Sequence, residues 1–400
     1  MSNPWRQDFP QIKPGRIYLD SAAMSLKPRS VIEAVEGYYS DFSVNVHRSL
    51  YQESIEATNL YEGARTKVAA FINAFPEEIV FTRGATAALN FVAMAYGMQN
   101  LKEGDEIITS ELEHHSSILP WREVAKKTGA KIKYLPLTET GKITVLNFKK
   151  VLSDKTRVVA LTHASNVLGY LTPIAEIISL AHQKKAITVI DCAQSVSSER
   201  IDVKKLDVDF LAFSGHKMLA PTGIGVLFGK KGLLNNLEPI EFGGDMNDFV
   251  TVEGATWKDS PYRFEAGTMP IASAIGLRAA IEYLELAGLD KIDQHLKDLY
   301  HYAIAGLKNI PGVKIYNPEA DKGIITFNLE GVPAHDAVSY YAEMGIMIRS
   351  GHHCAQLVSA FFGIDSSLRA SFHLYTTKED IDRFLEVSQA AVDFFRNLGF

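Results

Sequence analysis

The sequence predicts an α/β protein in which a mainly parallel sheet covered by helices is followed by a smaller α+β unit. Short aliphatic runs alternate with amphipathic helical stretches through the first two thirds of the chain. The chain has 400 residues, which is more than a single hydrophobic core usually serves, so two domains are expected. Beyond about Ala272 the alternation gives way to a helix-rich stretch and then to a few isolated strands.

The large domain is expected to span residues 15–285. Seven apolar runs have the length of buried strands: EEIVFT, DEIITS, KIKYLPL, RVVALT, AITVID, FLAFS and GIGVLFG. Helix-like segments separate several of them, and in residues 173–184 the apolar positions recur at helical spacing. Strands that alternate with helices imply crossover connections and a parallel sheet covered on both faces.

The small domain is expected to span residues 286–400, with residues 1–14 packed against it. Its candidate strands are GIITFNL, IMIRS and RASFHLY. The last helix is predicted to begin in TTKED, because Thr377 and Asp380 have the spacing of a capping box. The apolar face of this helix comprises Ile381, Phe384, Leu385 and Phe395.

Composition excludes several classes of partner and predicts a cytoplasmic protein. The formal net charge is -6, which argues against nucleic acid or an anionic membrane as the main partner. The N-terminus MSNPWRQDFP lacks the pattern of a signal peptide, and no apolar run approaches the roughly 20 residues that cross a bilayer. The two cysteines, far apart and without an export signal, are expected to be free thiols.

Chemistry in an open parallel sheet gathers at the carboxyl ends of the strands. After EEIVFT, the run RGATAALN leads into a probable helix, where free N–H groups and the Thr86 hydroxyl could hold a phosphate. Many strand-to-helix turns look like this one, so the signal is weak by itself. After DEIITS, His114 and His115 lie just beyond a strand end, although a buried histidine is usually a satisfied core residue.

Two charged residues at the ends of neighbouring strands carry more information. Asp191 ends a continuous apolar strand, where a carboxylate is costly unless a cation meets it. Lys217, beside Ser214 and His216, could be exposed or paired with Asp191. Alternatively, Lys217 forms a Schiff base with pyridoxal phosphate and Asp191 holds the pyridine nitrogen protonated. The glycines of PTGIGVLFG open a strand and lack the spacing of a dinucleotide fingerprint.

The run IRSGHHCAQ places Cys354 next to two histidines and close to Arg349. The cysteine could be a reactive thiol, a metal ligand or a small structural residue. A zinc site is disfavoured because adjacent residues rarely converge on one tetrahedral ion and no further ligand cluster is evident, so no metal is expected. A free thiol has a pKa near ~8.5, and nearby positive charge would increase its reactive fraction. Cys192, in or just after an apolar strand, is expected to be core.

The chain resembles the Suf-type (group II) cysteine desulfurases, within the class V aminotransferase-like family of fold-type I pyridoxal phosphate enzymes. The resemblance runs almost end to end and is most specific in FSGHK together with RSGHHCA. The other motifs that carry it are YLDSAA, NVHRS, RGAT, EHHSSILPW, SNVLG, DCAQ, PTGIGVLFG, RFEAGT and LRASF.

The resemblance implies a pyridoxal phosphate site and a role for each matching residue. Lys217 would carry the Schiff base and remove the substrate α-proton, and Cys354 would accept sulfur from L-cysteine as a persulfide. His114 would stack on the cofactor ring, Asp191 would pair with its nitrogen, and Gln194 would bond its oxygen. The phosphate would be held by Thr86, Ser214 and His216, with Thr268 reaching in from a second subunit. The substrate would be bound by Asn166, Arg369 and Arg349.

The resemblance also implies a homodimer, a sulfur-acceptor protein of the Suf system and a role in iron–sulfur cluster assembly. The chain departs from the usual pattern at Met24, Ala87 and Met269, which bears on the choice among cysteine, selenocysteine and cysteine sulfinate. Another pyridoxal phosphate lyase or aminotransferase on the same fold would keep Lys217 and Asp191 but have no use for Cys354. His47 of NVHRS lines the site by family analogy or is a structural histidine.

Overall fold

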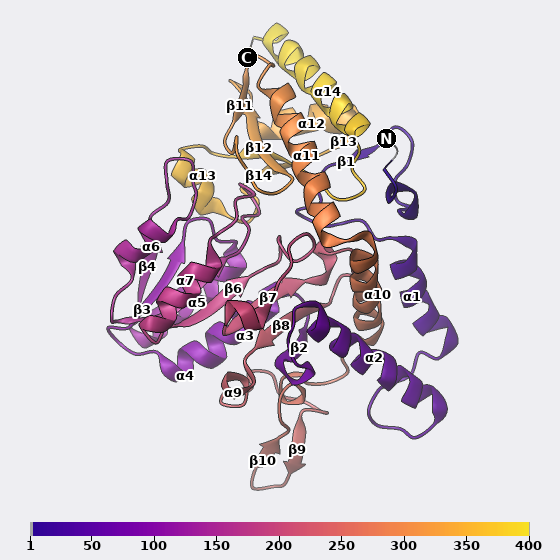
Figure 1. Cartoon of the computed structure of the whole chain (residues 1–400), viewed down its shortest axis with the longest axis vertical. Coiled ribbons are helices and arrows are strands. Elements are labelled where there is room, and N and C mark those ends of the chain that lie inside the picture. The colour runs from indigo at the N-terminus through magenta and orange to yellow at the C-terminus, as the bar shows by residue number, and fades with distance from the viewer. Residues whose placement is uncertain (1–2, 400) are drawn as a thin grey trace.

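The computed structural model describes residues 3–399, with a broad lower part built on one sheet and a narrower upper part (Figure 1). The lower part holds a seven-stranded sheet of order β2-β8-β7-β6-β5-β3-β4. Strands β7, β6, β5, β3 and β4 are mutually parallel, and β8 is antiparallel to both of its neighbours. The strands are β2 Ile79–Thr82, β3 Glu106–Ser110, β4 Lys131–Leu135, β5 Thr156–Thr162, β6 Ile187–Asp191, β7 Phe210–Ser214 and β8 Gly225–Gly229.

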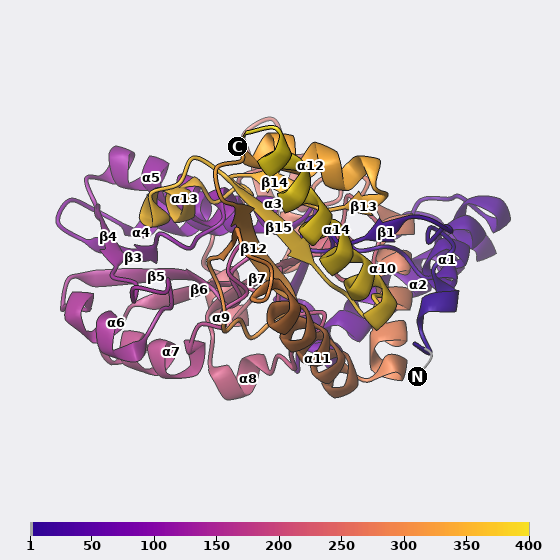
Figure 2. The ribbon, with the colours of Figure 1, turned by 90° about the horizontal axis from the view of Figure 1, so that it is seen from above.

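The predicted mainly parallel sheet and its seven strands are therefore confirmed. Their side chains alternate between two cores: Ile107 and Val158 face one layer of helices, whereas Ile108 and Val159 face the other. Figure 2 shows these two helical layers on opposite sides of the sheet. The first layer comprises α3 Ala85–Val92, α4 Met98–Asn100 and α5 His115–Thr128, and the second comprises α6 Val145–Val151, α7 Ile174–Gln183 and α8 Val203–Leu206.

Four further α-helices and a hairpin complete the lower part (Figure 1). α10 contacts both α1 and α2, which places the N-terminal helices beside the segment that leads to the upper part. A hairpin projects from the lower end of the molecule and exposes Phe249 and Val252 (Figure 1). These elements are α1 Arg29–Asp41, α2 Gln52–Phe71, α9 Lys231–Leu234, α10 Ile271–Ala287, and the hairpin strands β9 Asn247–Val250 and β10 Ala255–Trp257.

The upper part contains an antiparallel sheet of order β11-β12-β15-β14 with helices α11 and α14 packed together. The chain enters it at Gly288, between α10 and α11, close to the predicted boundary at residue 285. The division into residues 15–285 and 286–400 stays a prediction. The elements are α11 Leu289–Leu307, β11 Val313–Ile315, β12 Ile324–Leu329, α12 Ala334–Glu343, β14 Arg349–Gly351, α13 Gln356–Phe362, β15 Ser367–Ser371 and α14 Lys378–Asn397.

The capping box predicted for the last helix is present. The Thr377 hydroxyl accepts from the Asp380 N–H, and the Asp380 carboxylate accepts from the Thr377 N–H. The same carboxylate binds Arg6, which attaches the N-terminal segment to this helix. Among residues 3–399, no helix is both long and apolar enough to cross a bilayer.

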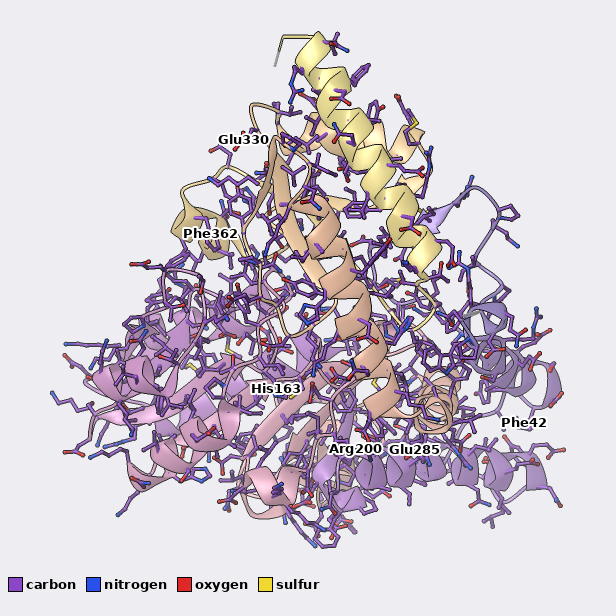
Figure 3. The ribbon with its side chains drawn as sticks, turned by 45° about the horizontal axis from the view of Figure 1, so that its top comes forward. Phe42, His163, Arg200, Glu285, Glu330 and Phe362 are labelled. Carbon is purple, nitrogen blue, oxygen red and sulfur yellow. The ribbon has the colours of Figure 1, made fainter. Side chains whose placement is uncertain are left out.

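The run IMIRS differs from the single strand that its apolar pattern predicts. Ile346–Met347 (β13) pairs in parallel with Ile17–Tyr18 (β1), whereas Arg349–Gly351 (β14) pairs with β15. The break lets β14 turn toward the large domain. α13 follows, and its Phe362, labelled in Figure 3, packs its ring 5.4 Å from that of Tyr316.

Candidate active site

A cavity of about 150 Å³ lies where the carboxyl ends of strands of the seven-stranded sheet meet the upper part of the molecule. Strands β3, β5, β6 and β7 direct their terminal loops into it, and β14 and β15 close it from the other side. The cavity brings together most of the residues predicted from the sequence. Those that line it are Thr86, His114, Asn166, Asp191, Ser214, His216, Lys217, Arg349, Cys354 and Arg369.

Gln194 and Thr268 lie outside this cavity. Gln194 lines a smaller adjoining cavity and donates to the Ala22 carbonyl at 2.8 Å. Thr268 lies in a separate hollow with Met269 and His47, whose Nε2 is 3.2 Å from a Glu62 carboxylate oxygen. Within one chain, neither Thr268 nor His47 belongs to the wall of the cavity around Lys217, and the predicted contribution of Thr268 to a second subunit stays a prediction.

The start of α3 forms a compact polar corner of the cavity. The Ala85 N–H donates to the Ser214 hydroxyl at 2.8 Å, and the Thr86 hydroxyl lies 2.7 Å from that of Ser116. A Cβ atom on Gly225 would lie 2.4 Å from the Gly84 Cα, so a glycine is required there for β8 to approach this turn. First-turn N–H groups and hydroxyls together are the donors that a phosphate group needs.

Asp191 and Lys217 form the charged floor of the cavity. Burial raises the pKa of Asp191, and the nearby positive charge of Lys217 and the Ala193 N–H at 2.9 Å oppose that rise. Burial lowers the pKa of Lys217, a trend that the Asp191 carboxylate opposes and the Arg369 guanidinium reinforces. A buried lysine with a lowered pKa is suited to both nucleophilic and base chemistry.

Two of the histidines that line the cavity, His114 and His216, are uncharged at neutral pH. Burial, followed by the positive charge of Lys217, lowers the pKa of His114 to about 3 and that of His216 to about 4. His114 precedes α5, and its Nδ1 accepts from the Ser116 N–H at 3.1 Å. The remaining proton is therefore on Nε2. His114 can stack or donate a hydrogen bond in the cavity, but it does not carry positive charge.

The Arg369 guanidinium is hydrogen-bonded through both terminal nitrogens but keeps one unused donor. One terminal nitrogen donates to the Asn166 carbonyl at 3.0 Å and the other to the Asp20 carboxylate at 2.9 Å. Its Nε is buried and has no protein acceptor among the described residues. A guanidinium fixed in orientation with an unused donor is suited to binding a carboxylate.

The loop that carries Cys354 is pinned to the large domain. The Cys354 carbonyl accepts from the His115 N–H at 2.8 Å, and the His353 carbonyl accepts from the Asn166 side chain at 2.7 Å. Both His353 and Cys354 have left-handed backbone conformations, with φ of 52° and 57°. Non-glycine residues adopt such conformations only when surrounding contacts enforce them. The thiol is exposed to solvent while its backbone is held over the cavity.

Of the two adjacent histidines, His353 does not supply positive charge to the thiol. Burial lowers its pKa to about 2, with the Arg369 and Arg349 charges adding to the effect. Its Nε2 lies 3.0 Å from the Ser367 carbonyl oxygen, and this contact fixes the orientation of the ring. Arg349, which lines the same cavity, remains a source of positive charge near Cys354.

Sequence reasoning gave no role to two residues of this site. Asp20 holds Arg369, and Ser116 bonds Thr86. Asp20 and Ser116 lie inside YLDSAA and EHHSSILPW, two motifs that carry the family resemblance, but the resemblance was not used to assign a role to either residue. The signal for Asp20 was its charge directly after the apolar run IYL, because a carboxylate in such a position needs a cationic partner.

Comparisons with known proteins identify the family of the chain. The aminotransferase class-V family matches residues 17–384. The chain belongs to the aminotransferase class-V family. It is 50% identical over 380 residues to a probable cysteine desulfurase of Halalkalibacterium halodurans, covering 95% of this chain and 94% of that protein. It is 47% identical over 381 residues to a probable cysteine desulfurase of Staphylococcus aureus strain N315, covering 94% and 92%.

Two solved structures of cysteine desulfurases superpose closely on the chain. The cysteine desulfurase CsdA of Escherichia coli, in an S-sulfonic acid form, is 40% identical with a TM-score of 0.93, covering 98% of this chain and 99% of that chain. The apo cysteine desulfurase of Thermococcus onnurineus NA1 is 39% identical with a TM-score of 0.95 and the same coverage. The predicted α/β fold and membership of the class V aminotransferase-like family are therefore confirmed, and the Suf-type (group II) subtype stays a prediction.

The class-V family implies pyridoxal phosphate, and the residues present fit that group. A polar corner at the start of α3 suits a phosphate, and buried Asp191 suits a protonated ring nitrogen. Lys217, half-buried with a lowered pKa, suits covalent attachment to a carbonyl. Among residues 3–399, no group of three or more His, Cys, Asp or Glu side chains is placed to hold a metal ion.

Proposed function

We propose that this protein is a pyridoxal phosphate-dependent cysteine desulfurase that converts L-cysteine to L-alanine and takes the sulfur as a persulfide on Cys354. The observation that carries the proposal is one cavity that joins an exposed thiol, a half-buried lysine with a lowered pKa and an oriented arginine. An aminotransferase or carbon–carbon lyase would use the lysine and the arginine, but it has no chemical need for an exposed thiol over them.

The cofactor would be held by the large domain. Thr86, Ser214 and His216 would bind its phosphate, His114 would stack on the ring, Asp191 would pair with the ring nitrogen, and Gln194 would bond the ring oxygen. When bound, pyridoxal phosphate supplies an electron sink that makes the substrate α-proton acidic.

The side chains of this protein perform the remaining tasks. The unused Nε donor of Arg369, together with Asn166, would bind the substrate carboxylate, and Arg349 would hold its other end near the thiol. Lys217, whose lowered pKa leaves a larger fraction of the amine unprotonated, would accept the α-proton at Nζ. Both steps use groups whose positions are fixed by Asp20 and by the end of β7.

Cys354 would then accept the sulfur atom of the substrate. Its thiolate attacks the substrate sulfur and forms an S–S bond, while the bond between that sulfur and the substrate Cβ breaks. The Cβ gains a proton and the product is alanine, so the enzyme keeps one sulfur atom as a persulfide. An exposed persulfide can be passed to a second protein, and we assign that role to an acceptor of the Suf system that supplies iron–sulfur cluster assembly.

The proposal includes a cytoplasmic homodimer in which Thr268 of each subunit completes the phosphate site of the other. Supporting this arrangement, Thr268 lines open hollows and is not among the residues that line the Lys217 cavity of its own chain.

The test uses purified protein loaded with pyridoxal phosphate, L-cysteine and a reductant. Alanine and sulfide are quantified together for the wild type and for Cys354→Ala. Equal amounts of both products, lost in the variant, are expected. Alanine formation that survives in Cys354→Ala would contradict the proposal, as would turnover of selenocysteine or cysteine sulfinate with none of L-cysteine.

A further inference from the structure

A second cavity, of about 30 Å³, adjoins the cavity around Lys217 and Cys354. Lys217 lines both this cavity and the larger one that holds Cys354. Its walls come from residues 21–22, the loop after β6, the start of β12 and the end of β15. Most of the wall residues are polar: Ser21, Gln194, Ser197, Ser198, Lys322, Ser371 and His373.

His373 is the wall residue whose protonation state can be assigned. The side chain is buried, with 4% exposed, and its ring stacks on Tyr375 with centroids 5.4 Å apart. The Leu374 N–H donates to Nδ1 at 2.9 Å, and a backbone N–H can only donate, so Nδ1 carries no proton. Burial lowers the pKa of His373 to about 3, helped by the charges of His295 and Lys27. The ring is therefore neutral and protonated on Nε2.

The Nε2–H group of His373 has no acceptor in the protein among residues 3–399. Buried donors are almost always partnered, and an ordered water is the usual partner where the protein offers none. A cavity can hold a water molecule when about 10–15 Å³ is accessible to the centre of the molecule. The cavity next to His373 offers about 30 Å³, which is sufficient. The polar wall supplies the further hydrogen bonds that such a water requires.

We propose that this cavity holds ordered water that His373 orients toward the Lys217 amine, which makes His373 a positioning residue for proton exchange at Lys217. The importance of that exchange rests on the proposed function of Lys217. Lys217 lines both cavities, so a water in the smaller one could exchange protons with Lys217 while Cys354 and the substrate occupy the larger one.

The orientation has a defined electrostatic consequence. A water that accepts from the His373 Nε2–H has both of its protons free, and accepting a hydrogen bond makes it a stronger donor. A donor aimed at the amine favours the unprotonated lysine. Other charged or titratable groups act on these two residues from the neighbouring elements. They are Asp191, Arg369, Cys354, Arg349, His114 and His216 around Lys217, and His295 and Lys27 around His373, with Lys322 in the cavity wall.

Two substitutions separate the proposed role from a structural one. In His373→Asn, the side-chain oxygen can replace Nδ1 and keep the Leu374 N–H bonded, but no donor reaches the cavity. In His373→Gln, the side-chain amide can replace the Nε2–H donor, but the bond to Leu374 is lost. A structural role would make the Gln variant the worse one, whereas the proposed role makes the Asn variant the worse one.

The first readout is a high-resolution crystal structure of each protein. The wild type and His373→Gln are expected to show a water about 2.7–3.2 Å from the donor, and His373→Asn is expected to lack it. The second readout is the pH dependence of the rate at which cofactor-free protein attaches pyridoxal phosphate, followed by absorbance without cysteine. Only the unprotonated Lys217 amine reacts, so the midpoint for His373→Asn is expected to move to higher pH by about half a unit. Below the midpoint, that is about a threefold slower rate.

A water retained in His373→Asn, a dry cavity in the wild type, or an Asn midpoint equal to that of the wild type would overturn the proposal. A Gln midpoint as displaced as that of Asn would also overturn it. If the wild type failed to attach the cofactor at all, the proposed function would be contradicted instead. The crystallographic water alone would then decide whether the cavity is a water site.

Discussion

The two reactive residues of this protein are held in opposite ways. Lys217 follows β7 in a short turn whose backbone is bonded to the sheet, since the Gly215 N–H donates to the Ile224 carbonyl at 2.9 Å. Burial and the Arg369 guanidinium keep its pKa low. Cys354 lies in a loop of the small domain with a left-handed backbone, and its thiol is exposed.

The difference separates proton chemistry from sulfur delivery. Proton transfer benefits from a rigid site with little water, because charge interactions there are strong and geometry is fixed. A thiol that must collect sulfur inside and release it outside has to stay accessible. The backbone of Cys354 is nevertheless fixed, since its carbonyl and that of His353 both accept hydrogen bonds from the large domain.

The largest effects are expected from removing either reactive side chain, and the two losses should differ in kind. Lys217→Ala should lower alanine formation more than about 100-fold and abolish covalent attachment of pyridoxal phosphate, because the amine performs both tasks. Cys354→Ala should abolish sulfide release but leave the absorbance of the attached cofactor unchanged. Turnover and absorbance spectra measured on the same samples check this. A cofactor spectrum altered by Cys354→Ala would contradict the separation.

The next largest effect is expected at Asp20, which orients Arg369 and contacts neither reactive residue in the described structure. Asp20→Asn should lower kcat/KM for L-cysteine by about 10- to 100-fold, the range of one hydrogen bond to a charged group. The loss should appear mainly in KM, because the carboxylate-binding donor is misplaced. Asp290→Asn is a matched control, since Asp290 pairs with exposed Arg200 (Figure 3) far along the chain. Equal kinetics for Asp20→Asn and Asp290→Asn would exclude this role.

Sequence patterns predicted the fold and most of the cavity for a physical reason. Parallel strands place their carboxyl ends at one edge, so Asp191, Ser214 and Lys217 had to lie together once the alternation of strands and helices was recognised. The thiol loop was found because a cysteine beside two histidines is unusual in a chain with two cysteines.

Other features depend on contacts that no local pattern encodes. The pairing of Asp20 with Arg369 joins residues 349 positions apart. The splitting of IMIRS into β13 and β14 depends on where β1 lies in space. The neutrality of His353 depends on how deeply the fold buries it. The buried, unpartnered Nε2 of His373 likewise becomes visible only once the interface between the two domains is built.

A smaller effect is expected on the free energy of unfolding at low pH. It arises from the buried His373, which lines a cavity beside Lys217. His373 has an ordinary pKa near 6.5 when unfolded and about 3 when folded, so the unfolded state binds the extra proton. Its contribution is fully present above pH 6.5 and is lost as the pH falls toward 3. Between pH 7.5 and 5, the wild type should lose about 2 kcal/mol more unfolding free energy than His373→Gln. Urea unfolding at both pH values measures this, and equal losses would contradict it.

The smallest effect is expected at the N-cap of α14, on the small-domain side. Thr377→Ala removes the hydroxyl that accepts from the Asp380 N–H and should lower the unfolding free energy by about 1 kcal/mol. Arg383→Ala, at an exposed position of the same helix, should change it by less than about 0.5 kcal/mol. Attachment of the cofactor to Lys217 should be unaffected by either. Equal denaturation midpoints for the two variants would show that the cap does not stabilise this domain.

The central claim is that sulfur moves from L-cysteine to Cys354 under the control of Lys217. The most direct measurement is the mass of the Cys354 peptide after the cofactor-loaded protein meets L-cysteine without reductant. The account predicts the added mass of one sulfur atom on Cys354, together with one alanine per sulfur gained, and neither in Lys217→Ala. Alanine released while the Cys354 peptide keeps its original mass, or a persulfide formed equally in Lys217→Ala, would contradict it.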